Sequence, residues 1–143
     1  MKKFLFFSLL AILMIGCNKN QKVVKKIDGT WKVTKYNETY DGITENALDP
    51  EDGVIEFVFD NCKLKEDEFC IVKWIQTYPD GEVDIEVMEY RVEANGTSLE
   101  FRYFEDPSSI MFSEITELTK DKMVFFTDYG NGESDELSFE KVK

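Results

Sequence analysis

Beyond residue 27, polar and apolar residues alternate over short runs, which is typical of β-strands that bury one face. No stretch in this region keeps the period of an amphipathic helix over several turns. The runs are rich in Val, Ile, Phe, Tyr and Trp, and they predict eight strands, at residues 29–36, 54–60, 69–78, 82–94, 98–104, 109–118, 122–128 and 136–142. One helical turn is predicted in the longest gap, at residues 46–48.

Turn-forming residues separate these runs. Asn95-Gly96 is the strongest signal, because both central positions of a type I′ hairpin require a positive φ. The segments at 78–81 (YPDG) and 130–132 (GNG) also predict turns, since proline presets φ and glycine tolerates the left-handed region.

A two-residue loop at Asn95-Gly96 specifies the register of the strands on either side of it. Opposite residues then have numbers that sum to 191, and a slip of one residue would reverse every side chain. The resulting pairs are Met88–Tyr103, Tyr90–Phe101 and Val92–Leu99 on an apolar face, with Arg91–Glu100 and Glu89–Arg102 on a charged face. We expect the charged pairs to be exposed cross-strand ion pairs rather than ligand anchors.

The strand at 82–94 changes phase along its length. Apolar positions 83, 85 and 87 have the opposite parity from apolar positions 88, 90 and 92. Such a change predicts a β-bulge near residues 87–88, where the strand would bend.

Alternation and the hairpin register together predict which large side chains face inward. These candidate ligand contacts are Trp74, Met88, Tyr90, Phe101, Tyr103, Phe112 and Phe125. The alternative is that the same side chains fill a solid core. Because buried tyrosine hydroxyls need hydrogen-bond partners, we favour a cavity bordered by Tyr90 and Tyr103.

The N-terminus has the features of an export signal. Lys2 and Lys3 precede an apolar run at residues 4–15, which as a helix would be about 18 Å long and therefore too short for a bilayer core of about 30 Å. A short basic start, an apolar stretch and the small residue Gly16 predict a secretory signal peptide over residues 1–16.

The sequence Met14-Ile15-Gly16-Cys17 resembles the lipobox of bacterial lipoproteins. The resemblance implies that Cys17 is the lipid-modified first residue of the mature protein, on a membrane of the bacterial cell envelope, with the outer membrane as the expected location. Residues 17–27 then form a lipidated N-terminus and a basic tether, whose four lysines lie against anionic headgroups or are simply solvated.

Cys62 and Cys70 remain as an even pair in an exported chain. We predict a disulfide between them, worth about 2.5 kcal/mol for so short a loop, with two free thiols as the alternative. The spacing is not C-x-x-C, so a redox or metal role has little support.

Composition excludes several functions. The 143 residues include no histidine, which rules out Ser-His-Asp and Cys-His centres within the chain. The net charge of −12 argues against a nucleic-acid partner.

All 29 acidic residues lie from Asp28 onward with 11 of the 17 basic ones, so residues 28–143 carry −18. No carboxylate pair stands out as acid and base, and the acidic segment 128–135 is better explained as a hairpin turn than as a calcium site.

Gly29-Thr30-Trp31 matches the G-x-W motif of lipocalins, and residues 115–118 (ITEL) and 137–139 (LSF) are similar to the lipocalin-like domains of bacterial lipoproteins. The resemblance spans residues 28–143 and implies one all-β domain, an eight-stranded antiparallel up-and-down barrel. In that family the tryptophan packs at the closed end of the barrel, often under a late arginine. Here Lys141 or Lys143 would take that place.

These features predict a membrane-anchored protein that binds or carries a small, mostly hydrophobic ligand, with no enzymatic activity, cofactor or metal. The alternative is a filled barrel that acts as a protein-interaction or envelope-assembly module.

Overall fold

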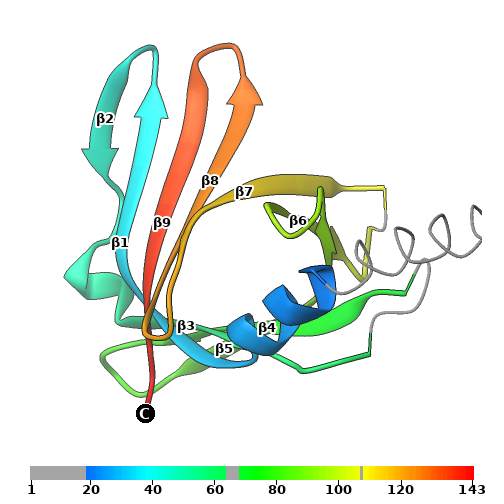
Figure 1. Cartoon of the computed structure of the whole chain (residues 1–143). Helices are drawn as coiled ribbons and strands as arrows, with labels where there is room; N and C mark the ends of the chain where they lie inside the picture. Colours follow the sequence, from blue (N-terminus) through cyan, green and yellow to red (C-terminus); the bar gives the residue numbers. More distant parts are fainter. Residues whose placement is uncertain (1–18, 64–67, 107) are drawn as a thin grey trace, which may run out of the picture.

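The computed structural model describes residues 19–63, 68–106 and 108–143, and within them the chain forms one helix-capped β-barrel (Figure 1). A helix over residues 19–27 precedes the strands. The strands are β1 (Gly29–Tyr40), β2 (Ile43–Asn46), β3 (Val54–Phe59), β4 (Cys70–Thr77), β5 (Val83–Glu93), β6 (Ser98–Tyr103), β7 (Ile110–Leu118), β8 (Lys122–Gly130) and β9 (Glu133–Lys141).

Eight of these strands form a closed antiparallel barrel, which confirms the predicted architecture. Each strand from β3 to β9 pairs with its neighbour in sequence, and β1 pairs with both β3 and β9. The remaining strand, β2, pairs only with the second half of β1 and is fully exposed. Alternation could not predict β2, because its sequence (ITEN) has no buried face. The helical turn predicted at 46–48 lies later, as a 3-10 turn at Pro50–Asp52 capped by Asp49.

One end of the barrel is packed solid. Trp31, Phe59 and Phe139 are buried there, and the Phe59 ring meets the Tyr90 ring edge to face at 5.2 Å. The Tyr90 hydroxyl donates a hydrogen bond of 2.9 Å to the Asp60 carbonyl. We refer to this end as the closed end.

The helix over residues 19–27 covers the closed end, where a basic tether was expected. Val24 and Ile27 are completely buried, and the Trp31 indole N–H donates to the Ile27 carbonyl at 2.7 Å. A Cβ on Gly96 would lie only 2.8 Å from Val23, so the β5–β6 hairpin also packs against the helix. The short apolar run Val23-Val24 and Ile27 is one face of this helix, too brief to be recognised as a helical period.

Of the two lysines expected to cover Trp31, Lys141 does so. Its ammonium lies 4.9 Å from the indole centroid and donates to the Asp28 carbonyl at 2.7 Å. The last strand of the barrel is thereby linked to the junction between the helix and β1.

The predicted disulfide is confirmed. Cys62 and Cys70 are bonded, with their Cα atoms 5.7 Å apart, and they close the connection between β3 and β4. Gln21 on the helix donates a hydrogen bond of 2.9 Å to the Cys62 carbonyl, so the disulfide-bonded loop also contacts the closed-end helix.

The register calculated from Asn95-Gly96 is confirmed for every pair from Met88–Tyr103 to Val92–Leu99. The two-residue loop itself is wrong, because four residues, 94–97, join the strands, and the Gly96 N–H donates to the Glu93 carbonyl around Ala94 and Asn95, both at positive φ. The register survives because the longer loop has the same centre.

The charged face differs from the prediction in two respects. Arg102 binds Glu100 at 2.7 Å instead of its predicted partner Glu89, so Glu100 is shared with Arg91, which binds it at 2.6 Å. Glu100 is also only 2% exposed, where an exposed pair was expected. Both guanidinium groups lie over the ring of Phe69, which shields the carboxylate from water.

The bulge predicted near residues 87–88 is wrong. The pairing of β4 with β5 runs without a shift from Cys70–Tyr90 to Thr77–Val83. The change of phase has a different cause, because Ile85 lies on the outer surface, 60% exposed, while Glu86 faces the interior of the barrel. Bulges occur instead between Val33 and Lys35 in β1, and in β7 and β8.

We expect Tyr90→Ala to lower the free energy of unfolding by about 3–5 kcal/mol, because a large, fully buried aromatic side chain is removed from the closed end. Tyr90→Phe keeps the ring and loses only the hydrogen bond to Asp60, so it should cost about 1 kcal/mol. Urea unfolding followed by fluorescence measures both changes. Equal losses for the two variants would contradict this account of the closed end.

Candidate functional site

A cavity of about 290 Å³ occupies the barrel interior on the side away from the helix. Its walls are mainly aromatic and aliphatic, with a few hydroxyl and carboxylate groups among them. The lining residues are Tyr36, Phe57, Trp74, Glu86, Met88, Phe101, Tyr103, Met111, Ser113, Phe125, Thr127, Tyr129, Asp135, Leu137 and Phe139. The volume is just below the range of about 300–1,000 Å³ that is usual for small-molecule sites.

Five of the seven predicted inward residues line this cavity: Trp74, Met88, Phe101, Tyr103 and Phe125. Tyr90 is buried as predicted but belongs to the closed end, so it does not border the cavity.

The prediction that Phe112 faces inward is wrong. Its side chain is 58% exposed on the outer surface. Met111 is the partner of the inward-facing Phe101 on the neighbouring strand, and so it takes the inward position in β7. The alternation of β7 therefore places Met111 and Ser113 inside and Phe112 outside.

Sequence reasoning missed ten of the residues that line the cavity. The bulge between Val33 and Lys35 reverses the alternation in β1, and without it Tyr36 would not share a face with Trp31. In β9, a signal was available, because Asp135, Leu137 and Phe139 are two residues apart and so lie on one face of the strand.

Two tyrosines share one carboxylate at the mouth of the cavity. Tyr36 and Tyr129 both donate to Oδ2 of Asp135, at 3.2 and 2.8 Å. Burial raises the pKa of both hydroxyls, and the negative charges of Asp135 and Glu38 raise it further. Both phenols therefore stay protonated and orient Asp135 at neutral pH.

Glu86 extends into the mouth from β5. It is the cross-strand partner of Trp74, and both side chains line the cavity together with Tyr103. Burial raises the pKa of Tyr103, and the Glu86 carboxylate adds to that rise. These three side chains bring one charge and two aromatic rings to the same part of the wall.

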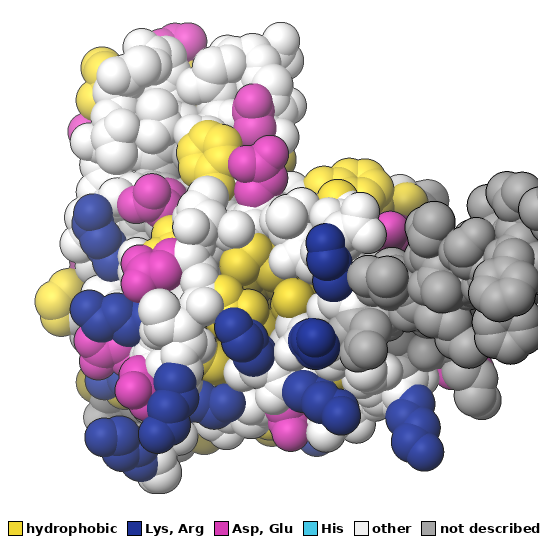
Figure 2. All heavy atoms as spheres, in the orientation of Figure 1, with side chains coloured by type: hydrophobic (Ala, Val, Ile, Leu, Met, Phe, Trp, Pro, Cys, Tyr) yellow, Lys and Arg dark blue, Asp and Glu magenta, His cyan; other side chains and the backbone are white. Residues whose placement is uncertain are grey.

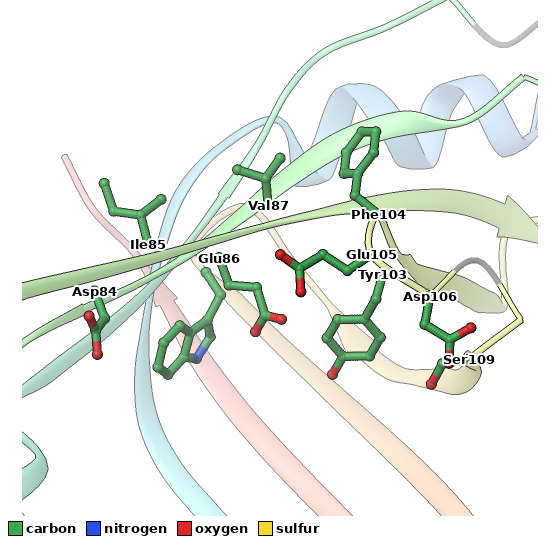
Figure 3. A pocket seen from close by; sticks show the side chains of 10 residues that line it. Asp84, Ile85, Glu86, Val87, Tyr103, Phe104, Glu105, Asp106 and Ser109 are labelled. Carbon is green, nitrogen blue, oxygen red and sulfur yellow. The ribbon is translucent and has the colours of Figure 1, made fainter.

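Outside the mouth, a hollow of about 770 Å³ continues from the cavity (Figure 3). Glu86 and Tyr103 line both spaces, while Glu105 and Asp106 belong to the outer hollow alone. Figure 3 shows Ile85 on the opposite side of the strand from Glu86, as the alternation of β5 requires.

One buried polar pair lies in the cavity wall. The hydroxyls of Ser113 and Thr127 are 2.7 Å apart and satisfy each other. Either can reorient toward a ligand, since a hydroxyl both donates and accepts. Within the described residues no group of three or more Cys, Asp or Glu side chains is placed to hold a metal ion, and the acidic segment at 128–135 forms the β8–β9 hairpin.

Neither a scan of protein-family models nor a search of curated proteins finds a match to the chain. Solved structures do match. A lipocalin-like protein from Bacteroides uniformis ATCC 8492 has a TM-score of 0.52 at 14% identity, over 82% of this chain and 99% of that one. Lobster apocrustacyanin A1 has a TM-score of 0.51 at 13% identity, over 82% of this chain and 62% of that one. Apocrustacyanin C2 has 0.52 at 14%, over 90% and 69%. The chain therefore has a lipocalin-like fold.

Tyr36 and Tyr129 make the free energy of unfolding depend on pH in the alkaline range. Because their pKa is higher in the folded chain than the value of about 10 for an unfolded one, their contribution is complete below about pH 10 and is lost as the pH rises above it. Asp135→Asn removes a charge that raises both pKa values, so the loss of stability with pH should become less steep. Urea unfolding between neutral and alkaline pH measures the slope.

Asp121→Asn is the control for this measurement, because Asp121 is an exposed carboxylate in the β7–β8 turn, at the closed end. The slope for this variant should match that of the native protein. Identical slopes for Asp135→Asn and Asp121→Asn would show that Asp135 has no influence on the tyrosines.

Proposed function

We propose that this protein binds and carries a small, mostly hydrophobic ligand inside the barrel. The observation that carries the proposal is the cavity of about 290 Å³ in a barrel whose other end is packed solid. An eight-stranded barrel has just enough room to be filled by side chains, so an unfilled volume at one end is a distinct feature.

The chemistry of the walls supports a largely apolar ligand. Phe57, Phe101, Phe125 and Phe139 supply aromatic surface, and the Ser113–Thr127 pair supplies two hydroxyls for orientation. A site of this kind gains affinity from apolar contact and specificity from a few polar groups. No side chain of the site has the arrangement of a nucleophile with a base, so the proposed role is binding without catalysis.

A second candidate, an interaction module, is favoured by an apolar patch on the outer surface. Val83, Ile85 and Val87 of β5 are exposed, and Phe104 lines the same outer hollow as Ile85 and Val87. Apolar groups gathered on an outer surface often mark contact with another protein. We rank this role second, because the interaction module was expected to be a filled barrel and this barrel contains a cavity.

We also propose that the protein is exported and held on a bacterial membrane through Cys17. The lipobox-like segment 14–17 lies outside the described residues, and the helix over 19–27 begins two residues after Cys17. Its lysines, Lys19, Lys22, Lys25 and Lys26, are all exposed. Figure 2 shows Lys and Arg side chains gathered over the lower part of this face. Such a surface suits anionic headgroups, and the cavity mouth at the other end would then point away from the membrane.

Binding can be tested with N-phenyl-1-naphthylamine, a fluorescent probe that is uncharged at neutral pH and brightens in apolar surroundings. The native protein should bind it. Met111→Trp fills the cavity and should abolish binding at a stability cost of about 1–3 kcal/mol. Phe112→Trp adds a similar ring on the outer surface of the same strand and should leave binding unchanged.

If Met111→Trp does not fold, Leu137→Phe fills the same cavity from β9 and is judged by the same titration. No probe binding by the native protein, or equal binding by the variants at 111 and 112, would reject the carrier function in favour of the interaction module.

The anchor is tested by expressing the full chain in a bacterial host. Mass analysis of membrane-bound protein should find Cys17 as the N-terminal residue, carrying a diacylglyceryl group. Cys17→Ser should release the protein into the soluble fraction without changing its urea unfolding midpoint. An unmodified N-terminus at another position would exclude the anchor.

A further inference from the structure

The charged side chains around the cavity mouth all have the same sign. Glu86 and Asp135 line the cavity, and Asp84, Glu105 and Asp106 join Glu86 around the outer hollow. None of the described residues that line either space is a lysine or an arginine. Carboxylates converging on one entrance create a negative potential there, which attracts cations and repels anions.

These carboxylates differ in how far the protein already satisfies them. Asp84 accepts a hydrogen bond from Tyr78, and Asp106 accepts from Ser108. Asp135 accepts two bonds, both on Oδ2. Glu86, in contrast, has no hydrogen bond or ion pair with any described residue. Glu105 has none either, but it lines only the outer hollow, so Glu86 is the carboxylate inside the cavity that remains available to a ligand.

Aromatic rings lie next to this available carboxylate. Trp74 is directly opposite Glu86 on β4, and Tyr103 is opposite Met88, the next inward residue of β5. Both rings line the cavity and the outer hollow, as Glu86 does. The face of an aromatic ring attracts a cation, most strongly for tryptophan, so the rings and the carboxylate favour the same charge.

We infer that the ligand is an organic cation, a protonated amine or quaternary ammonium group on an apolar body. The apolar body would lie among the phenylalanines of the cavity, and the cationic group would lie at the mouth between Glu86, Trp74 and Tyr103. This inference rests on the proposed carrier function and specifies its ligand class. It also disfavours fatty-acid anions, whose carboxylate would meet Glu86 and Asp135.

The raised pKa values of Tyr103 and Tyr129 agree with a negative potential at the mouth. The charge of Glu86 raises the pKa of Tyr103, and that of Asp135 raises the pKa of Tyr129, each in addition to the effect of burial. A field that resists the formation of a phenolate also resists the entry of an anionic ligand and favours a cationic one.

Three probes with the same apolar body and different charge test the inference: 4-phenylbutylamine, 4-phenylbutan-1-ol and 4-phenylbutanoate. Calorimetric titration of the full-length protein at neutral pH should find the amine bound about tenfold more tightly than the alcohol, with the acid weakest. Glu86→Gln should weaken amine binding about tenfold and leave alcohol binding unchanged. Glu140→Gln removes an equal charge from an exposed position on β9 and should change neither.

Equal affinities for amine and alcohol, or equal effects of Glu86→Gln and Glu140→Gln, would overturn the cation inference. If N-phenyl-1-naphthylamine still binds in that case, the carrier function stands with an uncharged ligand. If neither the naphthylamine nor any of the three probes binds, the carrier function and the cation inference both fail.

Discussion

The pairing of β1 with β9 is the constraint on which the rest of this structure depends. It joins the first and last strands along most of their length, from Trp31–Lys141 to Thr39–Ser134, and turns an open sheet into a barrel without free edges in its ring. Closure gives every strand an inside and an outside, so alternation along the sequence becomes a division between core and solvent. It also brings Lys141 over Trp31, where the chain's last strand meets its first.

The two ends of the barrel differ in how their interiors are packed. At the closed end, the helix over residues 19–27, the disulfide-bonded loop and the β5–β6 hairpin exclude water from Trp31 and Tyr90. At the mouth, the inward positions of β5 and β9 are Glu86 and Asp135, which cannot pack as a dry core. Beside these carboxylates the aromatic side chains line a cavity instead of filling the barrel. Figure 1 shows the β1–β2 and β8–β9 hairpins projecting beyond this region, away from the helix.

Local chemistry explains which parts of the fold could be predicted. The Asn95-Gly96 signal locates the centre of a hairpin, and the observed pairing of Met88 with Tyr103 follows from that centre although the loop spans four residues, 94–97. The Cys62–Cys70 disulfide needs only two cysteines in neighbouring strand ends. In contrast, the phase change at residues 87–88 has two explanations that look identical in sequence, a bulge or a strand with an apolar outer surface. Only the neighbouring strand, which pairs with β5 without a shift, decides between them.

The sequence by itself determined eight of the nine strands and five of the residues that line the cavity, because alternation and turn chemistry act over a few neighbouring residues. The barrel class followed from the resemblance to lipocalins. Tertiary structure alone decided that Tyr90 belongs to the closed end and Phe112 to the outer surface, since depth along a barrel and the register of β7 depend on strands far away in the chain. It also decided that Glu86 and Asp135 share one mouth with Trp74 and Tyr103. These residues come from four different strands. Their proximity results from closure of the barrel, so no pattern of neighbouring residues in the sequence can predict it.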